Sequence, residues 1–268
     1  MQNDYPLNTV IDGISNQDYH NHAAIGSSQC KNLLKSPWHF EYNRKHPKPP
    51  TAAMQFGSLV HQLVLEPQKF EQNYFVAEKP KKTTKEGKAM YAKLDAERGR
   101  RIWVTTDDFL KAEDMRHNLS QNDLVKVLLQ GGRAEQAVFW VDNDTGILCK
   151  AKADYLNVEK GLIVDLKTTA NIASEICFRR TTAQFQYHLS AALYQDGFQQ
   201  ATGQRLDFFI VAIESFAPHN YAIYKLSDEL LAQGRSLYTE ALIIYQAADN
   251  VGDFAVPYYQ GRLVELVA

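Results

Sequence analysis

The stretch Gly161-Leu162-Ile163-Val164-Asp165-Leu166-Lys167 decides the fold, because an apolar run of this length bounded by a glycine is typical of a buried strand. Side chains two residues apart in a strand point to the same face, so Asp165 and Lys167 share one face. A second strand-like segment, which ends in Lys152-Ala153-Asp154-Tyr155, precedes it across a short turn. A hairpin between the two segments can bring Asp154 across to Asp165 and Lys167.

Two acids and a lysine that meet in this way suit phosphodiester chemistry. The carboxylates of Asp154 and Asp165 can hold a divalent cation, and the lysine can reach a scissile phosphate or its attacking water. Acids and lysines are common, however, and the spacing alone is a weak signal. A plain ion pair between Asp165 and Lys167 is the alternative interpretation.

The composition is that of an ordinary soluble protein. The chain has 268 residues, 45% of them hydrophobic, and a formal net charge of −2. This length suits a single domain over residues 1–268, with a mainly helical part (1–130) and a sheet-centred catalytic core (131–268). No run approaches the roughly 20 apolar residues of a membrane span, and the N-terminus lacks the pattern of a secretory signal. The three cysteines are too scattered for a disulfide framework or a zinc site. We therefore expect a cytoplasmic protein without membrane contact.

Any phosphate-binding region has to be local, because the net charge excludes an evenly basic surface. Residues 79–101 contain nine lysines and arginines against three acids. Residues 31–48 contain five, with Trp38, Phe40 and Tyr42 interleaved. Basic residues with interleaved aromatic residues suit a nucleic-acid groove, and solvated loops and helix faces are the alternative.

The apolar pattern predicts helices first and then a sheet. Residues 15–22 are predicted to be irregular, and a helix capped by Ser27 or Ser28 is predicted to stop before Pro37. Further helices are predicted over 57–66, 85–97 and 107–130, and strands over 135–142, 145–156 and 162–167. A helix over 182–202, strands over 207–214 and 221–226, and a helix over 228–248 follow. This order predicts an α/β (α+β) fold, in which helices flank a central mixed sheet and the hairpin of Asp154 and Asp165 lies in its middle.

A second motif is Gly57-Ser58-Leu59-Val60-His61, followed by Leu65-Glu66-Pro67. A lone histidine among apolar residues of a helix is more often a core residue than a metal ligand. Together with segments 25–37, 135–140, 146–154, 165–169 and 187–197, however, this motif resembles the RecE, or exonuclease VIII, branch of the PD-(D/E)xK nucleases. The RecB nuclease domain and lambda exonuclease are relatives of that branch. The segments span most of the chain in the expected order, and they are specific jointly rather than singly.

The resemblance implies roles for individual residues. Asp154 and Asp165 match the two metal-binding acids, and Lys167 matches the catalytic lysine. His61 matches a metal-coordinating histidine, and the main-chain carbonyl of Leu166 would be an additional ligand. Oxygen ligands with one imidazole suit Mg²⁺ and also bind Mn²⁺ tightly. We therefore expect Mg²⁺ as the cofactor, with Mn²⁺ able to substitute.

The helix after the lysine departs from the pattern of related nucleases, which often carry Gln-x-x-x-Tyr there. In this chain Gln186 is followed at that spacing by Ser190, and Tyr194 lies one turn beyond. This helix face either contacts DNA or packs on the sheet. The DNA-binding candidates are Ser27, Ser28, Lys31, Gln186, Tyr187 and His188. Glu135 and Glu66 are candidate partners of the metal ligands, and Glu66 is alternatively an exposed acid at a helix end.

The resemblance implies a metal-dependent exodeoxyribonuclease that degrades one strand of linear duplex DNA processively from its 5′ end. The remaining 3′ single strand would pass to a RecT-like annealing protein. A homotetrameric ring is also implied, and it would turn basic segments toward a central channel. A PD-(D/E)xK endonuclease and a catalytically inactive DNA-binding homologue are the alternatives. A sequence-specific endonuclease needs side chains that read base edges, and the chain shows no recognisable reading module. An inactive homologue would be expected to have lost Lys167 or an acid, and none is missing.

Overall fold

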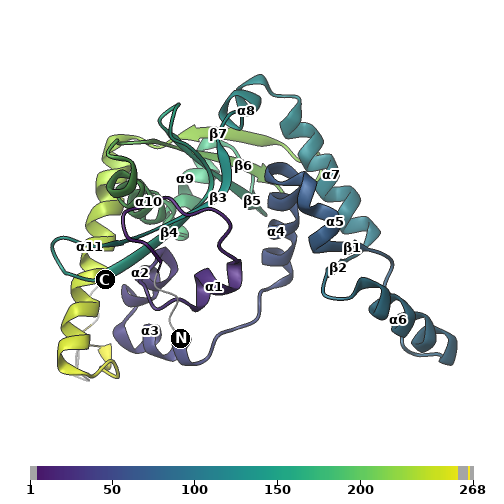
Figure 1. The fold of residues 1–268 in the computed structure, drawn as a ribbon, viewed down its shortest axis with the longest axis horizontal. Coiled ribbons are helices and arrows are strands. Elements are labelled where there is room, and N and C mark those ends of the chain that lie inside the picture. Colours follow the sequence, from purple (N-terminus) through teal and green to yellow (C-terminus); the bar gives the residue numbers. More distant parts are fainter. Residues whose placement is uncertain (1–4, 259–264, 266–268) are drawn as a thin grey trace.

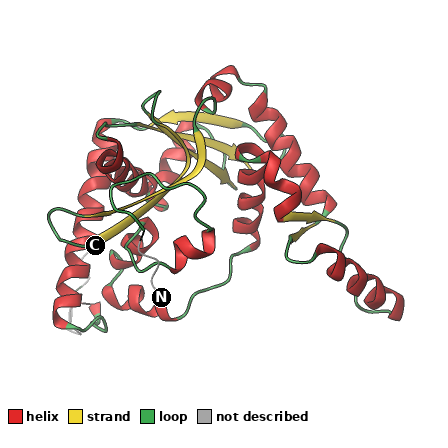
Figure 2. Cartoon of the chain, in the orientation of Figure 1, coloured by secondary structure: helices red, strands yellow, loops and turns green. Residues whose placement is uncertain are grey.

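A five-stranded mixed sheet forms the centre of the structure, a computed structural model that describes residues 5–258 and 265 (Figures 1 and 2). The strands, in their order across the sheet, are β3 (Arg133–Val141), β4 (Leu148–Asn157), β5 (Leu162–Thr169), β6 (Asp207–Glu214) and β7 (Tyr221–Lys225). β3, β4 and β5 form an antiparallel meander, β6 is parallel to β5, and β7 is antiparallel to β6. The predicted mixed sheet is confirmed, and the hairpin of β4 and β5 lies inside it.

Helices cover both faces of this sheet (Figure 1). They are α1 (Asn16–Asn21), α2 (Ser27–Leu33), α3 (Pro37–Lys45), α4 (Ala52–Leu65), the 3-10 helix η1 (Pro67–Lys69), α5 (Phe70–Asn73), α6 (Lys85–Arg98), α7 (Thr106–Ser120), α8 (Asp123–Leu128), α9 (Glu175–Gln184), α10 (Tyr187–Thr202) and α11 (Asp228–Val251). One face packs against α2, α3, α9, α10 and α11, and the other against α4, α7 and α8. Among the described residues, no helix has the length and apolar character needed to span a membrane.

Successive side chains of β5 pack alternately into two separate hydrophobic cores. Ile163 packs with the buried residues of α10 and α11, whereas Val164 and Leu166 pack with those of α4 and α7. Because neighbouring residues of a strand point to opposite faces, Asp165 and Lys167 fall on the same face as Ile163. The charged end of β5 is therefore directed toward the side of α2 and α10.

A small unit projects from the main body. β1 (Tyr74–Val76) and β2 (Ile102–Val104) form a two-stranded parallel sheet, and α6 lies between them in the chain. No described residue of α6 is buried, and Figure 1 shows this helix extending away from the central sheet. The segment 79–101, called the basic arm below, belongs to this unit. The sequence pattern predicted the helix of this segment but neither of the strands β1 and β2.

Helix starts differ from the predictions because other residues cap them. Residues 15–22, predicted to be irregular, contain α1, and its cap is the hydroxyl of Ser15. Gly26 is the cap residue of α2, so the prediction of Ser27 or Ser28 in this role is wrong. α4 begins several residues before the predicted start, because the hydroxyl of Thr51 accepts a hydrogen bond from the backbone of the first turn.

Two predicted long helices are each divided in two. The segment 107–130 breaks between α7 and α8, where the side chain of Asn122 caps the second helix. The segment 182–202 breaks at Gln186, whose φ of 50° lies in the left-handed region and cannot continue a right-handed helix. The strands over 135–142, 145–156, 162–167, 207–214 and 221–226 are confirmed, with ends that shift by a few residues.

We expect Gly234→Ala to lower the free energy of unfolding by about 2 kcal/mol or more, as overpacking outweighs the gain of ~1 kcal/mol in helix propensity. Gly234 of α11 lies so close to α10 that a β-carbon there would be 2.0 Å from the carbonyl oxygen of His188. Chemical denaturation measures the effect. Ser236→Ala, on an exposed position of the same helix, is the matched control and should leave the midpoint unchanged. A midpoint for Gly234→Ala equal to that of the parent would contradict the tight contact.

Candidate functional site

The hairpin of β4 and β5 opens at its two acids. Backbone pairing ends at Tyr155 and Val164, one step before Asp154 would face Asp165. Beyond that point, Oδ2 of Asp154 accepts a hydrogen bond of 2.8 Å from the backbone N–H of Leu166. The side chain of Asp154 in β4 thus replaces a backbone hydrogen-bond partner of β5. The carboxylates of Asp154 and Asp165 lie at the opening.

Glu135 of β3 brings a third carboxylate to the same place. The pairs on either side of it put Glu135 opposite Asp154, although these two residues are not themselves paired. Its φ is 56°, in the left-handed region that a residue with a side chain seldom adopts. The alternation of faces also shifts here, since Ala153 and Leu156, three residues apart in β4, pack in the same core. This local irregularity allows neighbouring strands to direct both carboxylates to one point.

α4 supplies an imidazole from the other side of the sheet. Its apolar residues pack into the core with α7, and His61 lies beside them with Nδ1 3.5 Å from Oδ2 of Asp154. One ligand atom from each of His61, Glu135 and Asp154 lies within 4.8 Å of the others. Two carboxylates and one imidazole fit a divalent cation, so this group could hold a metal ion. Glu135 was predicted to be a partner of the metal ligands, whereas its carboxylate is a member of the group itself.

Asp165 and Lys167 form an ion pair beside this group. Nζ of Lys167 lies 2.5 Å from Oδ2 of Asp165, which is the contact that the alternative interpretation, a plain ion pair, predicts. The same ammonium group is 5.5 Å from the centre of the Tyr187 ring, and Nζ of Lys31 is 5.8 Å from that ring. Two lysines from α2 and β5 therefore adjoin one aromatic ring of α10, next to the acids.

Burial and the gathered charges shift the pKa values of this site. Burial raises the pKa of Asp154 to about 6, a shift that His61 opposes and Asp165 increases. Burial alone would lower the pKa of Lys167, but the carboxylates of Asp165 and Asp154 outweigh it and raise this pKa above its usual value. Burial and the charge of Lys167 lower the pKa of Lys31 to about 8. Lys167 therefore stays charged throughout the neutral range, whereas Lys31 loses part of its charge as the pH approaches 8.

Tyr194 and Lys152 adjoin the site although sequence analysis does not propose them. Burial, with Asp165 as the next cause, raises the pKa of Tyr194 to about 12, and the neighbouring Ser27 opposes this rise. Tyr187 and Tyr194 are two helical turns apart in α10, a spacing that predicts a shared face. Nζ of Lys152 lies 2.7 Å from Oε2 of Glu135, and no sequence pattern indicates that pair.

The other predicted residues lie in different surroundings. Glu66 ends α4 and is paired with Lys69 at 2.5 Å, which is the arrangement of an acid at a helix end. Ser28 is exposed on α2. Gln186 and His188 line a pocket of about 500 Å³ enclosed by residues of α9, α10, β7 and α11. Of the three candidates at the start of α10, Tyr187 is thus the one that adjoins Lys167.

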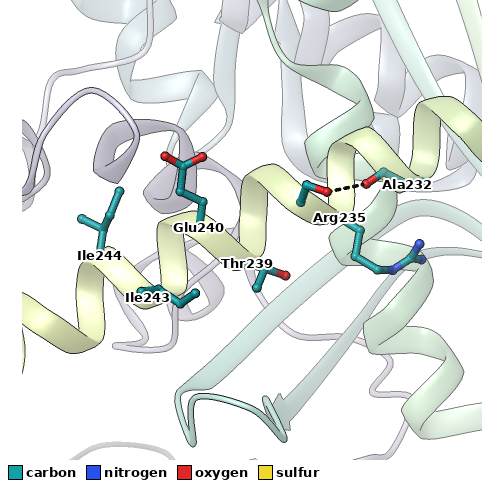
Figure 3. Close-up of a pocket in the computed structure, with 7 residues that line it drawn as sticks. Ala232, Arg235, Thr239, Glu240, Ile243 and Ile244 are labelled. Carbon is teal, nitrogen blue, oxygen red and sulfur yellow. Dashed lines mark hydrogen bonds between the residues drawn. The ribbon is translucent and has the colours of Figure 1, made fainter.

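A depression on the outer face of α11 is separate from this site. Its volume is about 580 Å³, and all of its lining residues come from α11 itself (Figure 3). Arg235 is one of them, and its guanidinium is already paired with Asp196, with Nε 2.6 Å from Oδ2. Within the described part of the chain, the metal-type group of side chains is the one at His61, not here. The open depression is therefore not a candidate for the chemistry.

Comparison with solved structures places the fold. The crystal structure of a proposed exonuclease from Eubacterium rectale has a TM-score of 0.63 to this chain, and the match covers 96% of each chain at 14% sequence identity. At that identity the likeness shows a shared fold. The crystal structure of SSO0001 has a TM-score of 0.32 at 15% identity, over 72% of this chain and 88% of that chain, which is too low to relate the two folds.

Comparison of sequences gives the family. No curated protein matches the chain in sequence. The sequence pattern of the family described as "PDDEXK-like domain of unknown function (DUF3799)" matches residues 26–255, which include every residue of the site described above. The match covers most of the chain, and the sheet with its acids at the open hairpin has the fold expected of such a domain. The chain therefore belongs to the PDDEXK-like domain family.

Proposed function

We propose that this chain is a metal-dependent exodeoxyribonuclease that degrades one strand of linear duplex DNA. The observation that carries the proposal is the meeting, at the open end of one hairpin, of the ligand group around His61 with the Asp165–Lys167 pair. Membership of the PDDEXK-like family supports the nuclease class. The shared fold with a proposed exonuclease supports the choice of an exonuclease within that class.

The proposed cofactor is Mg²⁺, with Mn²⁺ able to substitute. His61, Asp154, Asp165 and the main-chain carbonyl of Leu166 are the proposed ligands, and Glu135 joins them because its carboxylate lies in one group with His61 and Asp154. Carboxylate oxygens suit Mg²⁺, and the imidazole favours Mn²⁺. When bound, the cation would supply Lewis-acid activation of the phosphate and a lowered pKa of the attacking water.

The side chains of the site would bind and orient the scissile phosphate. Lys167 keeps its positive charge because neighbouring carboxylates raise its pKa, so it can hold a phosphate oxygen and stabilise the negative charge that develops during attack. Lys31 adjoins the same aromatic ring and would hold an adjacent phosphate of the strand. The two lysines thus define a path for the DNA backbone past the acids.

Two basic segments are the proposed DNA-binding surfaces. The basic arm carries nine lysines and arginines, and no described residue of its helix is buried. The segment 31–48 begins at Lys31 beside the site and continues into α3, where Trp38 and Tyr42 are exposed. Further proposed contacts are Ser27, Ser28, Gln186, Tyr187 and His188. Binding through phosphate contacts of this kind weakens steeply as the salt concentration rises.

The resemblance to the RecE branch supports finer proposals. The strand would be removed processively from its 5′ end in the cytoplasm, and the 3′ single strand would pass to a RecT-like annealing protein. A homotetrameric ring would allow a chain with a net charge of −2 to retain DNA, because basic segments from all subunits would line one channel.

Incubation with Mg²⁺ and either linear or closed circular duplex DNA tests the proposed function. We expect degradation of the linear DNA alone, because an exonuclease needs an end. Cutting of the circle would indicate an endonuclease, and binding without cutting would indicate an inactive homologue. Excess competitor DNA added after the start separates processive from distributive digestion. Light scattering on the same preparation measures the number of subunits, which we expect to be that of a tetramer.

We expect Lys167→Ala to slow DNA degradation by roughly 10²–10³-fold or more, because a preorganised charge at the reacting phosphate is lost. The variant should still fold and bind Mn²⁺, since Lys167 touches phosphate rather than the cation. Lys126→Ala is the matched control, because Lys126 forms an exposed ion pair on α8, and it should keep the rate of the parent. A rate for Lys167→Ala within a few-fold of the parent would remove this lysine from the site.

Asp154→Asn should stabilise the metal-free protein and abolish its stabilisation by metal. Folding raises the pKa of Asp154 to about 6, above the usual value near ~4, so ionisation of this carboxyl opposes folding. The penalty is absent below about pH 4 and complete above about pH 6, and the advantage of the variant should appear across that range and persist at higher pH. Melting curves with and without Mg²⁺ or Mn²⁺ measure both effects.

Two further variants make this measurement specific. Asp123→Asn changes an exposed acid of α8 and should retain the full metal-induced rise in melting temperature. His61→Ala should reduce the rise caused by Mn²⁺, which distinguishes a ligand from a core histidine. If Asp154→Asn shows the same metal-induced rise as the parent, Asp154 is not part of the metal site.

A further inference from the structure

The pocket of about 500 Å³ at the start of α10 lies next to the proposed catalytic site. Gln186 and His188, which flank Tyr187 in the chain, both line it, whereas Tyr187 itself adjoins Lys167. Ile210 of β6 also lines the pocket, and it is the register partner of Asp165 in the neighbouring strand β5. Pocket and acids are therefore neighbours on the same face of the sheet.

His188, which lines this pocket, has an unsatisfied hydrogen-bonding atom. Its Nδ1 is buried and has no hydrogen-bond partner among the described residues, and the residue is only 8% exposed. A neutral imidazole has one N–H donor and one acceptor nitrogen, so Nδ1 can form a hydrogen bond in either tautomer. Since buried polar atoms are almost always paired, this nitrogen points to a ligand with a hydrogen-bonding group.

The walls of the pocket favour a flat and uncharged ligand. The rings of Phe178 and Tyr224 stack with their centres 4.9 Å apart and their planes 5° apart. Aliphatic side chains, including Ile210, complete the apolar surface. The two cations at the pocket are already neutralised, Arg179 by Glu175 and Lys225 by Asp207, each at 2.6 Å. The pocket therefore does not select for an anion, and a planar group with hydrogen-bonding atoms at its edge fits it best.

We propose that this pocket receives one unpaired base of the DNA strand that is cut at the neighbouring acids. The inference rests on the proposed function and names how the substrate is held. A nucleobase is flat, stacks on aromatic side chains and carries both N–H donors and acceptor atoms at its edge, one of which could pair with Nδ1 of His188. The left-handed Gln186 begins α10 so that Tyr187 lies by Lys167 and His188 lies in the pocket. The backbone of the strand would pass Tyr187 while its base enters the pocket.

This arrangement gives a physical reason for a preference for DNA ends. A base has to leave the helical stack before it can enter a pocket, and that step costs least where the base is unpaired. Bases at the end of a duplex are the easiest to unpair. The pocket would thus select the strand terminus without contacting the terminal phosphate.

Binding of a duplex with one unpaired 5′ nucleotide tests the proposal, compared with the same duplex carrying an abasic nucleotide at that position. Lys167→Ala protein with Mg²⁺ is used, so that the DNA is bound without being consumed. We expect roughly tenfold tighter binding of the DNA that has the base, as one stacked base supplies. Ala183→Trp, at the exposed mouth of the pocket, should remove this difference, while the adjacent Gln184→Trp, outside the pocket, should keep it.

Gln233→Trp closes the same mouth from α11 and serves as the second variant in case Ala183→Trp does not fold. Equal affinity for the two duplexes, or an undiminished difference in both pocket variants, would overturn the proposal. The parent protein separates this failure from that of the proposed function. If the parent degrades DNA but treats both ends alike, the pocket assignment alone is wrong, and if it degrades no DNA, the proposed function is wrong.

Discussion

The site depends on holding three carboxylates together where little water can screen them. Like charges in a partly buried place repel strongly, so each acid needs a partner of opposite charge or a hydrogen-bond donor. The partners are Lys152 for Glu135, His61 for Asp154 and Lys167 for Asp165. Lys152 and Lys167 belong to the strands β4 and β5, and His61 belongs to α4, which is distant in the chain. A divalent cation could neutralise the same acids. Much of the surrounding fold can be understood as the means of bringing these charges together.

The opening of the hairpin explains how residues from both faces of a sheet can share one site. A complete ladder between β4 and β5 would keep α4 on one face apart from α10 on the other. The ladder stops at Tyr155 and Val164, and the hydrogen bond from the Leu166 amide to Asp154 occupies the gap. His61 then reaches the acids from the side of α4, while Lys167 and Tyr187 approach from the side of α10.

The parts of the structure that depend on short-range sequence patterns could be predicted from the sequence. The strand period of two and a short turn were enough to predict Asp154 opposite Asp165, and the central sheet follows from the same patterns. The place of Glu135 could not be predicted, because it depends on a left-handed backbone at a residue type that carries no signal for it. The break at Gln186 has the same origin. Helical spacing predicts that Tyr194 shares a face of α10 with Tyr187. Only the packing of α10 on β5 shows that this face meets the acids.

Packing constrains the sequence of the basic arm less than that of the rest of the chain. Its helix buries no described residue, and the arm is joined to the body through the short pair of β1 and β2. Substitutions in a packed core are limited by shape, whereas residues of an exposed helix are limited mainly by helix propensity and solubility. The length and charge of the arm can therefore diverge while the acids, the lysine and their packing stay fixed. Relatives with this architecture can therefore differ in the surface of the arm while the acidic site stays the same.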